Sequence, residues 1–347
     1  MTLALVTGAP GWLGTRLVEV LFGGLGDVPA LARPAAERRV RCLVFPGSDT
    51  RRLRQLGAEI VEGDLADPAA LERFTDSALG ATLFHVAGLV HPRRTRELFV
   101  TNVGGTDHLI ARAERAAVRR LVFVSSNSPF GTNPSPNDVF DETAPYRPYM
   151  KYGKSKMLAE QLVLAAERRG KLETVIVRPP WFYGPGQPPR QSLFFELIKD
   201  GRVPIVGAGD NRRSMVYVDN LCQGLLLAAE IERARGNAYW IADRRPYSMN
   251  EIVDTIERVL ERDFGVQVKH QRWHLPGITS EMAWVADKLL QTLGLYQQKI
   301  HVLSEMNKTI ACSIAKAEHE LGYDPKVELE EGMRRSIRWL IDQGGEL

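Results

Sequence analysis

The sequence LALVTGAPGWLG, residues 3–14, identifies the fold class of this chain. Its apolar beginning, residues 3–6, predicts a buried strand, and a helical pattern follows near Trp12. Three glycines, spaced three residues apart, span the turn between that strand and the helix: Gly8, Gly11 and Gly14. Glycine allows a tight turn, a close approach of the backbone to a pyrophosphate, and close packing of the helix on the strand. The N–H groups at the start of the helix would then face the phosphates, so we expect a dinucleotide to bind here.

A second segment, YGKSK at residues 152–156, places a phenol and an ammonium four residues apart in a predicted helix. Side chains at this spacing project from the same helix face. A tyrosine is about three pKa units too basic to exchange a proton near neutral pH, and a nearby ammonium lowers that pKa by favouring the phenolate. We therefore expect Tyr152 to act as general acid or base and Lys156 to tune it. Tyr149 has no such partner, since Gly153 lies four residues after it.

Composition and charge limit the possible functions. The 347 residues can bury a large core, and 44% hydrophobic with 25% charged residues is ordinary for a soluble globular protein. A net charge of +3 gives no electrostatic reason to expect a nucleic-acid or membrane partner. The three cysteines lack metal-like spacing, and the sequence contains no signal peptide or apolar run long enough to cross a bilayer. We therefore expect a cytoplasmic protein without a bound metal ion.

Apolar, β-branched runs alternate with amphipathic stretches along the first half of the chain. We predict strands at residues 3–6, 40–45, 59–62, 82–86, 120–124 and 174–177, and helices that include residues 95–117 and 149–168. Strands separated by helices pair in parallel through right-handed crossovers, which predicts an α/β fold with a doubly wound parallel (Rossmann) sheet. Residues 23–38 are longer than a usual connection and predict an extended surface loop, to which we assign no function.

Both segments resemble motifs of the extended short-chain dehydrogenase/reductase family, and further motifs follow in that family's order. They are GDL at residues 63–65, HVAG at 85–88, NVGGT at 102–106, VSS at 124–126, RPPWFYGPG at 178–186 and RRSMVYVDN at 212–220. ELGYDP near Leu321 and a final helix with Trp339 complete a resemblance that covers almost the whole chain. It implies an enzyme that depends on NAD or NADP.

The resemblance also implies two lobes. Residues 1–178 would form the dinucleotide-binding domain, residues 179–214 and 244–347 a smaller C-terminal α/β substrate lobe, and residues 215–243 would return to the first domain. Within the returning part, residues 215–218 and 238–242 would extend the sheet, and a helix at 249–262 would belong to the small lobe. We expect the active site between the lobes, at the carboxyl ends of the strands.

The residues of the site follow from the same resemblance. The catalytic set would be Tyr152, Lys156 and Ser126, in which Ser126 hydrogen-bonds the substrate oxygen as charge builds on it; Ser125 and Ser128 are neighbouring alternatives. Besides Ser126, the substrate would contact Trp181 and Arg213. The cofactor would contact the opening turn and later segments, at Gly8, Gly11, Trp12, Leu13, Gly14, Asp64, Leu65, Ala87, Gly88, Asn102, Ser125, Tyr152, Lys156 and Pro179.

The residues after Ser126 limit the reaction. Dehydratases of this family place an Asp-Glu pair beside the hydroxyl, and decarboxylating relatives place a glutamate slightly further on. Here the sequence is NSPF at residues 127–130, which argues against dehydration and decarboxylation. Oxidation, reduction or epimerisation at a carbinol carbon needs only hydride transfer and one proton relay.

The choice between NAD and NADP stays open at this point. An acidic residue at the end of the second strand would bind the ribose 2′-hydroxyl of NAD. This chain has FPGS at residues 45–48, and Asp49 comes only after it. Arg51 and Arg52 could reach a 2′-phosphate, or could simply begin a solvated helix.

Three functions remain. The first is oxidation, reduction or epimerisation of a nucleotide-activated sugar, whose diphosphate Arg213 would bind through its guanidinium. The second is a 3β-hydroxysteroid dehydrogenase-like dehydrogenase or ketoreductase for an apolar alcohol or ketone, with Trp181, Phe182 and Phe194 either lining the pocket or belonging to the core. The third is a non-catalytic NAD(P)-sensing protein, although such proteins typically lose the tyrosine or lysine that this chain retains.

Relatives often dimerise through the helices predicted here at 95–117 and 149–168, so we expect a homodimer.

Overall fold

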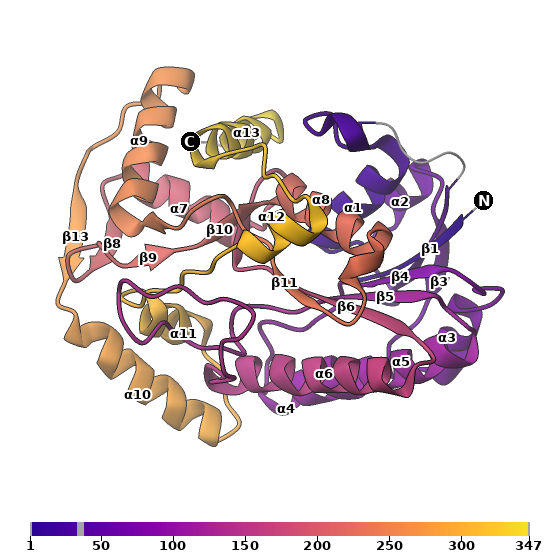
Figure 1. The fold of residues 1–347 in the computed structure, drawn as a ribbon. Coiled ribbons are helices and arrows are strands. Elements are labelled where there is room, and N and C mark those ends of the chain that lie inside the picture. The colour runs from indigo at the N-terminus through magenta and orange to yellow at the C-terminus, as the bar shows by residue number, and fades with distance from the viewer. Residues whose placement is uncertain (1, 33–37, 346–347) are drawn as a thin grey trace.

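The computed structural model describes residues 2–32 and 38–345. Its centre is a seven-stranded sheet in the order β11-β6-β5-β4-β1-β2-β3 (Figure 1), and every neighbouring pair is parallel. The strands are β1 (Thr2–Thr7), β2 (Arg38–Val44), β3 (Glu59–Glu62), β4 (Thr82–His85), β5 (Arg120–Val124), β6 (Glu173–Arg178) and β11 (Ala238–Trp240). The predicted α/β class with a doubly wound parallel sheet is confirmed.

Helices cover both faces of the sheet (Figure 1). They are α1 (Trp12–Gly23) and α8 (Val218–Glu230) on one face, and α3 (Pro68–Phe74), α5 (Gly105–Arg115) and α6 (Met150–Arg169) on the other. Adjacent strand residues point to opposite faces, so that Val6 lies in the core under α1 and α8 while Leu5 lies in the core under α3, α5 and α6. Strands buried on both faces have continuous apolar sequences, which is why the strand positions could be predicted.

The helix predicted at residues 95–117 is interrupted. It consists of α4 (Arg96–Leu98), a π-helical turn η2 (Phe99–Gly104) and α5. Such turns occur frequently at functional sites, and this one carries Asn102, which is buried. The helix predicted at residues 149–168 is present as α6.

Only one of the two returning segments joins the sheet. β11 pairs with β6, as predicted for residues 238–242. The prediction for residues 215–218 is wrong, because β10 (Met215–Tyr217) pairs with β7 (Trp181–Tyr183) in a separate two-stranded sheet. The edge of β6 is occupied by β11 instead.

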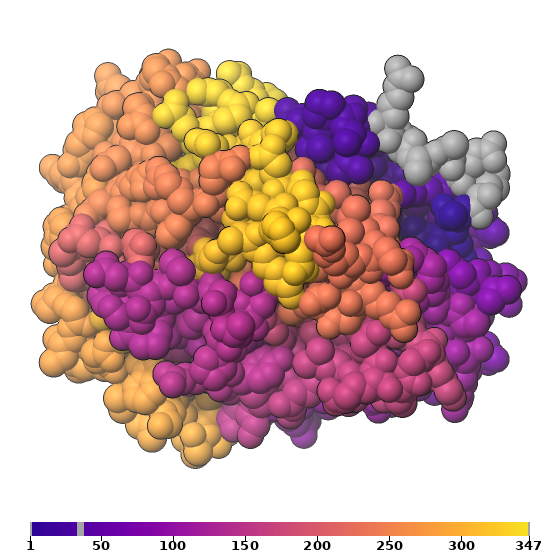
Figure 2. Space-filling view, viewed as in Figure 1, coloured from indigo at the N-terminus to yellow at the C-terminus, as the bar shows by residue number. Residues whose placement is uncertain are grey.

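The remaining elements gather mainly around the carboxyl end of the sheet. They are η1 (Pro29–Leu31), α2 (Arg51–Gln55), α7 (Pro189–Lys199), β8 (Val203–Val206), β9 (Arg212–Arg213), η3 (Glu232–Ala234), β12 (Tyr247–Ser248), α9 (Met249–Phe264), β13 (Arg272–Leu275), α10 (Ile278–Thr292), α11 (Gln298–Glu305), α12 (Ala315–Leu321) and α13 (Leu329–Asp342). Figure 2 shows the yellow C-terminal segment between orange segments on either side, with a magenta segment below it. The exact limits of the two lobes stay a prediction.

Two further expectations concern the chain outside the sheet. The predicted loop at residues 23–38 begins where α1 ends at Gly23 and contains η1, while residues 33–37 lie outside the described part of the chain. Among the described residues, no helix has the combination of length and hydropathy that crossing a bilayer requires.

Candidate active site

The three glycines form the tight turn that the sequence predicts. Gly8 has φ +89°, and a Cβ atom there would lie 2.6 Å from the backbone nitrogen of Ala87. The N–H of Gly11 donates to the carbonyl of Gly8 at 2.9 Å. A Cβ on Gly14 would lie 2.5 Å from the same carbonyl oxygen. Each position therefore excludes a side chain through close contact with backbone atoms.

The start of α1 fits a bound pyrophosphate. Gly11 is its N-cap and supplies no side-chain hydrogen bond, and the first turn carries no acidic residue. Within the described residues, the backbone N–H groups of Trp12, Leu13 and Gly14 have no hydrogen-bond acceptor. Free amides at the positive end of a helix dipole are suited to phosphate oxygens. The indole of Trp12 points elsewhere, since its Nε1 donates to the carbonyl of Pro185 at 2.7 Å.

His85 links the glycine turn to α5 and shapes the loop beneath the cofactor site. Its Nδ1 lies 2.8 Å from Thr7 Oγ1, and its Nε2 lies 2.9 Å from Thr106 Oγ1. The Thr106 hydroxyl donates to the carbonyl of Asn102, so Nε2 must be the donor and Nδ1 the acceptor. Burial, together with the charge of Lys156, lowers the pKa of His85 to about 3, so its ring is neutral. Thr7 Oγ1 also accepts from the N–H of Ala87.

Asn102 in the π-helical turn joins two parts of the site. Its Oδ1 accepts from the N–H of Leu89 at 2.7 Å, and its Nδ2 donates to the carbonyl of Leu89 and to Ser155 Oγ. It thereby fixes the loop after β4 against α6. A Cβ on Gly88 would lie 3.6 Å from Asn102 Oδ1 and 3.8 Å from Lys156 Nζ, so this loop and the lysine lie side by side.

Asp64, one of the predicted cofactor contacts, is exposed. Asp64 Oδ1 accepts from the N–H of Ala66 at 2.9 Å, and the neighbouring Leu65 is buried against Gly105. The two arginines after β2 already have carboxylate partners, since Arg51 pairs with Asp49 and Arg52 with Glu19. Their pairing leaves the choice between the two dinucleotides as open as the sequence does.

Tyr152, Lys156 and Ser126 converge where β5 ends and α6 begins. Burial raises the pKa of Tyr152 to about 12, and the neighbouring Ser126 hydroxyl partly opposes that rise. Lys156 Nζ donates to the carbonyl of Val124 at 2.7 Å and lies 4.3 Å from the centre of the Phe123 ring. Burial lowers the pKa of Lys156 to about 7.

One expectation about this pair is wrong. We expected Lys156 to lower the pKa of Tyr152, but burial dominates and the pKa rises. Lys156 is directed at the carbonyl of Val124, and its own positive charge is disfavoured by its surroundings. The phenol is therefore held in its protonated form at neutral pH.

Ser125 and Ser126 have different surroundings. Ser125 Oγ donates to Glu160, which forms a fully buried ion pair with Arg178 at 2.8 Å. Its side chain is thus committed to the protein interior. Ser126 Oγ, by contrast, lies 3.3 Å from Ser128 Oγ and near Tyr152. The sequence analysis missed Glu160, although its position four residues after Lys156 was a usable signal.

The helix α11 brings polar groups close to Tyr152 that the sequence analysis also missed. Tyr149 Oη lies 2.7 Å from Ser304 Oγ, which joins α11 to the start of α6. Near this contact lies the carboxylate of Glu305, whose charge adds to the rise in the pKa of Tyr152 that burial causes. The local sequence after Ser126 lacks a carboxylate, but the tertiary structure supplies one from α11. No local pattern could have revealed it.

Of the other predicted substrate residues, Arg213 lies near Glu305 and Tyr149. Burial lowers the pKa of Arg213, and the charges of Glu305 and Tyr149 oppose that shift. Arg213 Nε is buried and has no hydrogen-bond partner among the described residues. The partly exposed ring of Trp181 lies 6.0 Å from that of Phe194. Pro179, at the end of β6, is buried.

A second group of aromatic and basic side chains lies near Tyr152. His91 Nδ1 lies 2.7 Å from Tyr296 Oη, and Arg190 contacts the other ring nitrogen of His91. Burial, together with the charges of Arg190 and His301, lowers the pKa of His91 to about 4. Residues from the loop after β4, from α7 and from the segment after α10 thus meet.

A sequence profile for the NAD dependent epimerase/dehydratase family matches residues 4–242. The chain belongs to this family. Members of the family use NAD, so the predicted dependence on NAD or NADP is confirmed, and the chain is an NAD-dependent oxidoreductase of the epimerase/dehydratase family. The resemblance to extended short-chain dehydrogenases is confirmed with it.

Several known proteins are similar to this chain. The uncharacterized protein y4nL of Sinorhizobium fredii is 50% identical over 99% of this chain and 96% of its own length. A 2-alkyl-3-oxoalkanoate reductase of Stenotrophomonas maltophilia is 29% identical over 95% of this chain and 97% of its own. A 3β-hydroxysteroid dehydrogenase/isomerase of Mycobacterium tuberculosis is 28% identical over 97% and 90%. The dTDP-glucose 4,6-dehydratase DesIV of Streptomyces venezuelae, solved with NAD bound, has a TM-score of 0.73 and 26% identity, covering 99% of this chain and 97% of that one.

Proposed function

We propose that this protein is an NAD(P)-dependent reductase of a ketone on a largely apolar molecule. The observation that carries the proposal is the partly buried Tyr152 phenol, which lies beside Ser126 at the carboxyl end of the sheet and stays protonated at neutral pH. When bound, the dinucleotide supplies the hydride. The protein's own groups then have to deliver a proton and to stabilise the oxygen on which charge develops.

The protonation state of Tyr152 supports reduction over oxidation. An alkoxide is a stronger base than a phenolate, so a proton moves readily from the phenol to an oxygen that gains negative charge. Removal of a proton from an alcohol would instead require the phenolate, which burial disfavours. Ser126 would donate a hydrogen bond to the same oxygen, and the charged form of Lys156 would help to hold the cofactor.

Apolar side chains on β7 and α7 support an apolar substrate. The aromatic pair of Trp181 and Phe194 offers a partly exposed apolar surface. Arg213, the group expected to bind a diphosphate, already has the carboxylate of Glu305 near it, and that negative charge would repel a phosphate. Relatives that align over nearly their full length are named as a 2-alkyl-3-oxoalkanoate reductase and a 3β-hydroxysteroid dehydrogenase, and we extend this kind of substrate to the present chain.

The test is the oxidation of NADH and NADPH in the presence of long-chain 3-oxo acids and steroid ketones, followed by the absorbance of the reduced nicotinamide. We expect turnover with at least one of them, and the variant Tyr152→Phe should lose about 10²–10⁴-fold in kcat because it removes the acid. The matched control is Tyr149→Phe, which keeps the ring and removes a hydroxyl directed at Ser304; it should retain most of the activity. Equal rates in Tyr152→Phe and the wild type would exclude this role for the phenol.

A nucleotide-activated sugar is the second candidate, and the sequence motifs favoured it. Its specific support is the buried Arg213 Nε without a partner, because a diphosphate oxygen could accept from it. Titration with uridine, thymidine and guanosine diphosphates, read by thermal stabilisation, tests this candidate.

Under that hypothesis, Arg213→Ala should bind the preferred diphosphate at least about tenfold more weakly, which corresponds to about 1.4 kcal/mol. The control Arg212→Ala removes a neighbouring guanidinium that contacts the carbonyls of Pro136 and Asp138 instead. Unchanged binding in Arg213→Ala would remove the nucleotide sugar from consideration.

A further inference from the structure

A cavity of about 750 Å³ lies beside the start of α6, and none of its lining residues belongs to the predicted catalytic, cofactor or substrate set. Its walls are residues 131–134, the first turns of α6 and one side of α10. Lys154, which lines it, is two residues before Lys156, or about 200° around the helix. The cavity thus lies on the opposite side of α6 from the catalytic lysine. Its volume is in the range of small-molecule pockets, about 300–1,000 Å³.

The lining of this cavity is strongly basic. Arg147, Lys151, Lys154, Lys288 and Lys308 line it, and Glu281 is its one acidic side chain. Lys308 is paired with Glu281. In the part of the chain that the structure describes, the other four cations form no ion pair. Like charges that converge on one concave space raise its positive potential and concentrate anions there.

The backbone adds to this potential. The helix α6 begins at Met150 with no side-chain cap, so the positive end of its dipole faces the same space. The N–H of Lys151 donates to Gln291 Oε1 at 3.0 Å, which joins α6 to α10 across the cavity. The cations therefore stand on two elements held at a defined separation.

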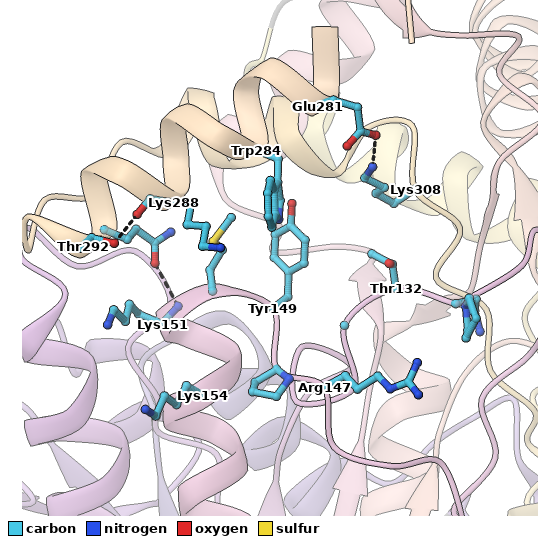
Figure 3. A pocket seen from close by; sticks show the side chains of 16 residues that line it. Thr132, Arg147, Tyr149, Lys151, Lys154, Glu281, Trp284, Lys288, Thr292 and Lys308 are labelled. Atoms are coloured by element: carbon cyan, nitrogen blue, oxygen red, sulfur yellow. Dashed lines mark hydrogen bonds and ion pairs between the residues drawn. The ribbon is translucent and has the colours of Figure 1, made fainter. Parts of the chain in front are cut away.

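One wall of the cavity is aromatic. Figure 3 shows Trp284 and Tyr149 between Lys288, Lys151 and Lys154 on one side and Arg147 on the other. Lys288 Nζ lies 4.9 Å from the centre of the Trp284 ring system. An inorganic anion would use only the charges, whereas a ligand with a planar ring would also use the indole.

We propose that this cavity is a second ligand site that binds an organic polyphosphate of the nucleoside triphosphate class. The polyphosphate would meet the lysines and the start of α6, and the base would lie against Trp284. The proposal does not depend on the reaction proposed above, because no residue of the cavity takes part in it. Binding here and turnover at Tyr152 can therefore succeed or fail separately.

The experiment is calorimetric titration of the full-length protein with ATP, with inorganic tripolyphosphate and with adenosine, in the presence of saturating NAD. Saturating NAD occupies the dinucleotide site, so that adenosine-containing probes report on the cavity alone. We expect ATP to bind, tripolyphosphate to bind at least tenfold more weakly, and adenosine to bind more weakly still. Absence of ATP binding to the wild type would overturn the proposal.

Two double variants test the location of the site. Lys154→Gln with Lys288→Gln removes two exposed cations of the cavity, and we expect at least a tenfold loss in ATP affinity. Lys171→Gln with Lys269→Gln removes two exposed lysines elsewhere and serves as the matched control, because it changes the net charge equally. Equal losses in both variants would show general attraction between charges and would overturn the proposal.

Trp284→Ala tests the position of the base. It should abolish the difference in affinity between ATP and tripolyphosphate, and an unchanged difference would overturn the assignment of the base to this wall.

Discussion

Lys156 is the residue whose chemistry depends most on its surroundings. Burial lowers its pKa to about 7, far below the usual value of about 10.4. The charged form is present below this pKa and is lost as the pH rises through it. If charged Lys156 holds the cofactor, activity should decline about tenfold per pH unit above about pH 7.

A pH profile of kcat/KM at fixed ionic strength measures this decline. The control is Lys156→Arg, because a guanidinium remains charged throughout the accessible range; whatever activity this variant retains should lack the decline near neutrality. A wild-type profile that stays flat far into the alkaline range would contradict the proposed role of the charge.

Gly8 offers a test of the opening turn at the same scale. It combines φ +89° with a predicted Cβ only 2.6 Å from the backbone of Ala87. Gly8→Ala should therefore distort the turn and cost about 1–3 kcal/mol, with loss of cofactor binding. At a concentration of NAD of 100 times Kd, the wild type should gain about 2.7 kcal/mol of stability, and Gly8→Ala should gain almost nothing.

Gly23→Ala is the matched control for this substitution, because Gly23 ends the same helix and a Cβ there meets no atom of the described residues within 4 Å. It should keep the full stabilisation by NAD. Denaturant unfolding with and without NAD separates the loss of binding from the loss of stability. Normal stabilisation of Gly8→Ala by NAD would show that the dinucleotide does not bind at this turn.

At the level of elements, α10 and α11 are held together by a buried charged pair. His301 Nδ1 lies 2.7 Å from Asp287 Oδ2, and the Asp287 side chain is fully buried. Burial alone would lower the pKa of His301, but Asp287 and Glu305 outweigh it and raise the pKa. The stabilisation that this pair gives to the folded protein is fully present below the pKa of His301 in the unfolded chain, about 6.5. It is lost as the pH rises through the higher pKa that His301 has in the folded protein.

Asp287→Asn should therefore destabilise the protein most at mildly acidic pH. We expect a loss of about 1–3 kcal/mol there, with the difference from the wild type shrinking as the pH rises through the raised pKa of His301. Urea unfolding at a series of pH values measures it. The stability of His301→Gln, whose side chain cannot be charged, should change little over the same pH range. A difference in stability between Asp287→Asn and the wild type that grows with pH would contradict the assignment.

The elements also show where sequence patterns fail. A run of helix-compatible residues at 95–117 predicted one helix, yet the segment contains the π-helical turn η2. Asn102 bonds across this turn to Leu89 and Ser155, and those partners come from other parts of the chain. Periodicity describes only neighbours in sequence, so it cannot register such a contact.

Across the whole molecule, Arg120 joins segments that are distant in sequence. Its side chain is fully buried, donates to the carbonyls of Ala229 and Ile231 at 3.0 and 2.7 Å, and pairs with Glu173 at 2.8 Å. It therefore connects β5 and β6 to the end of α8.

Arg120→Met should leave these partners without a donor and cost about 3–5 kcal/mol in the free energy of unfolding. Arg119→Met is the neighbouring control, whose half-exposed side chain should contribute at most about 1 kcal/mol. Denaturant midpoints of both variants measure the difference, and similar midpoints would contradict the role given to Arg120.

Local sequence was sufficient for the six strands, the glycine turn and the placement of Tyr152 and Lys156 on one helix. These features depend on residues within a few positions of one another, whose steric and polar requirements are visible in the order of the residues. The partner of β10, the carboxylate of Glu305 beside Tyr152, and the rise in the pKa of that tyrosine emerged from the folded chain. Burial and charge act through space, and the segments that bury Tyr152 lie far from it in sequence.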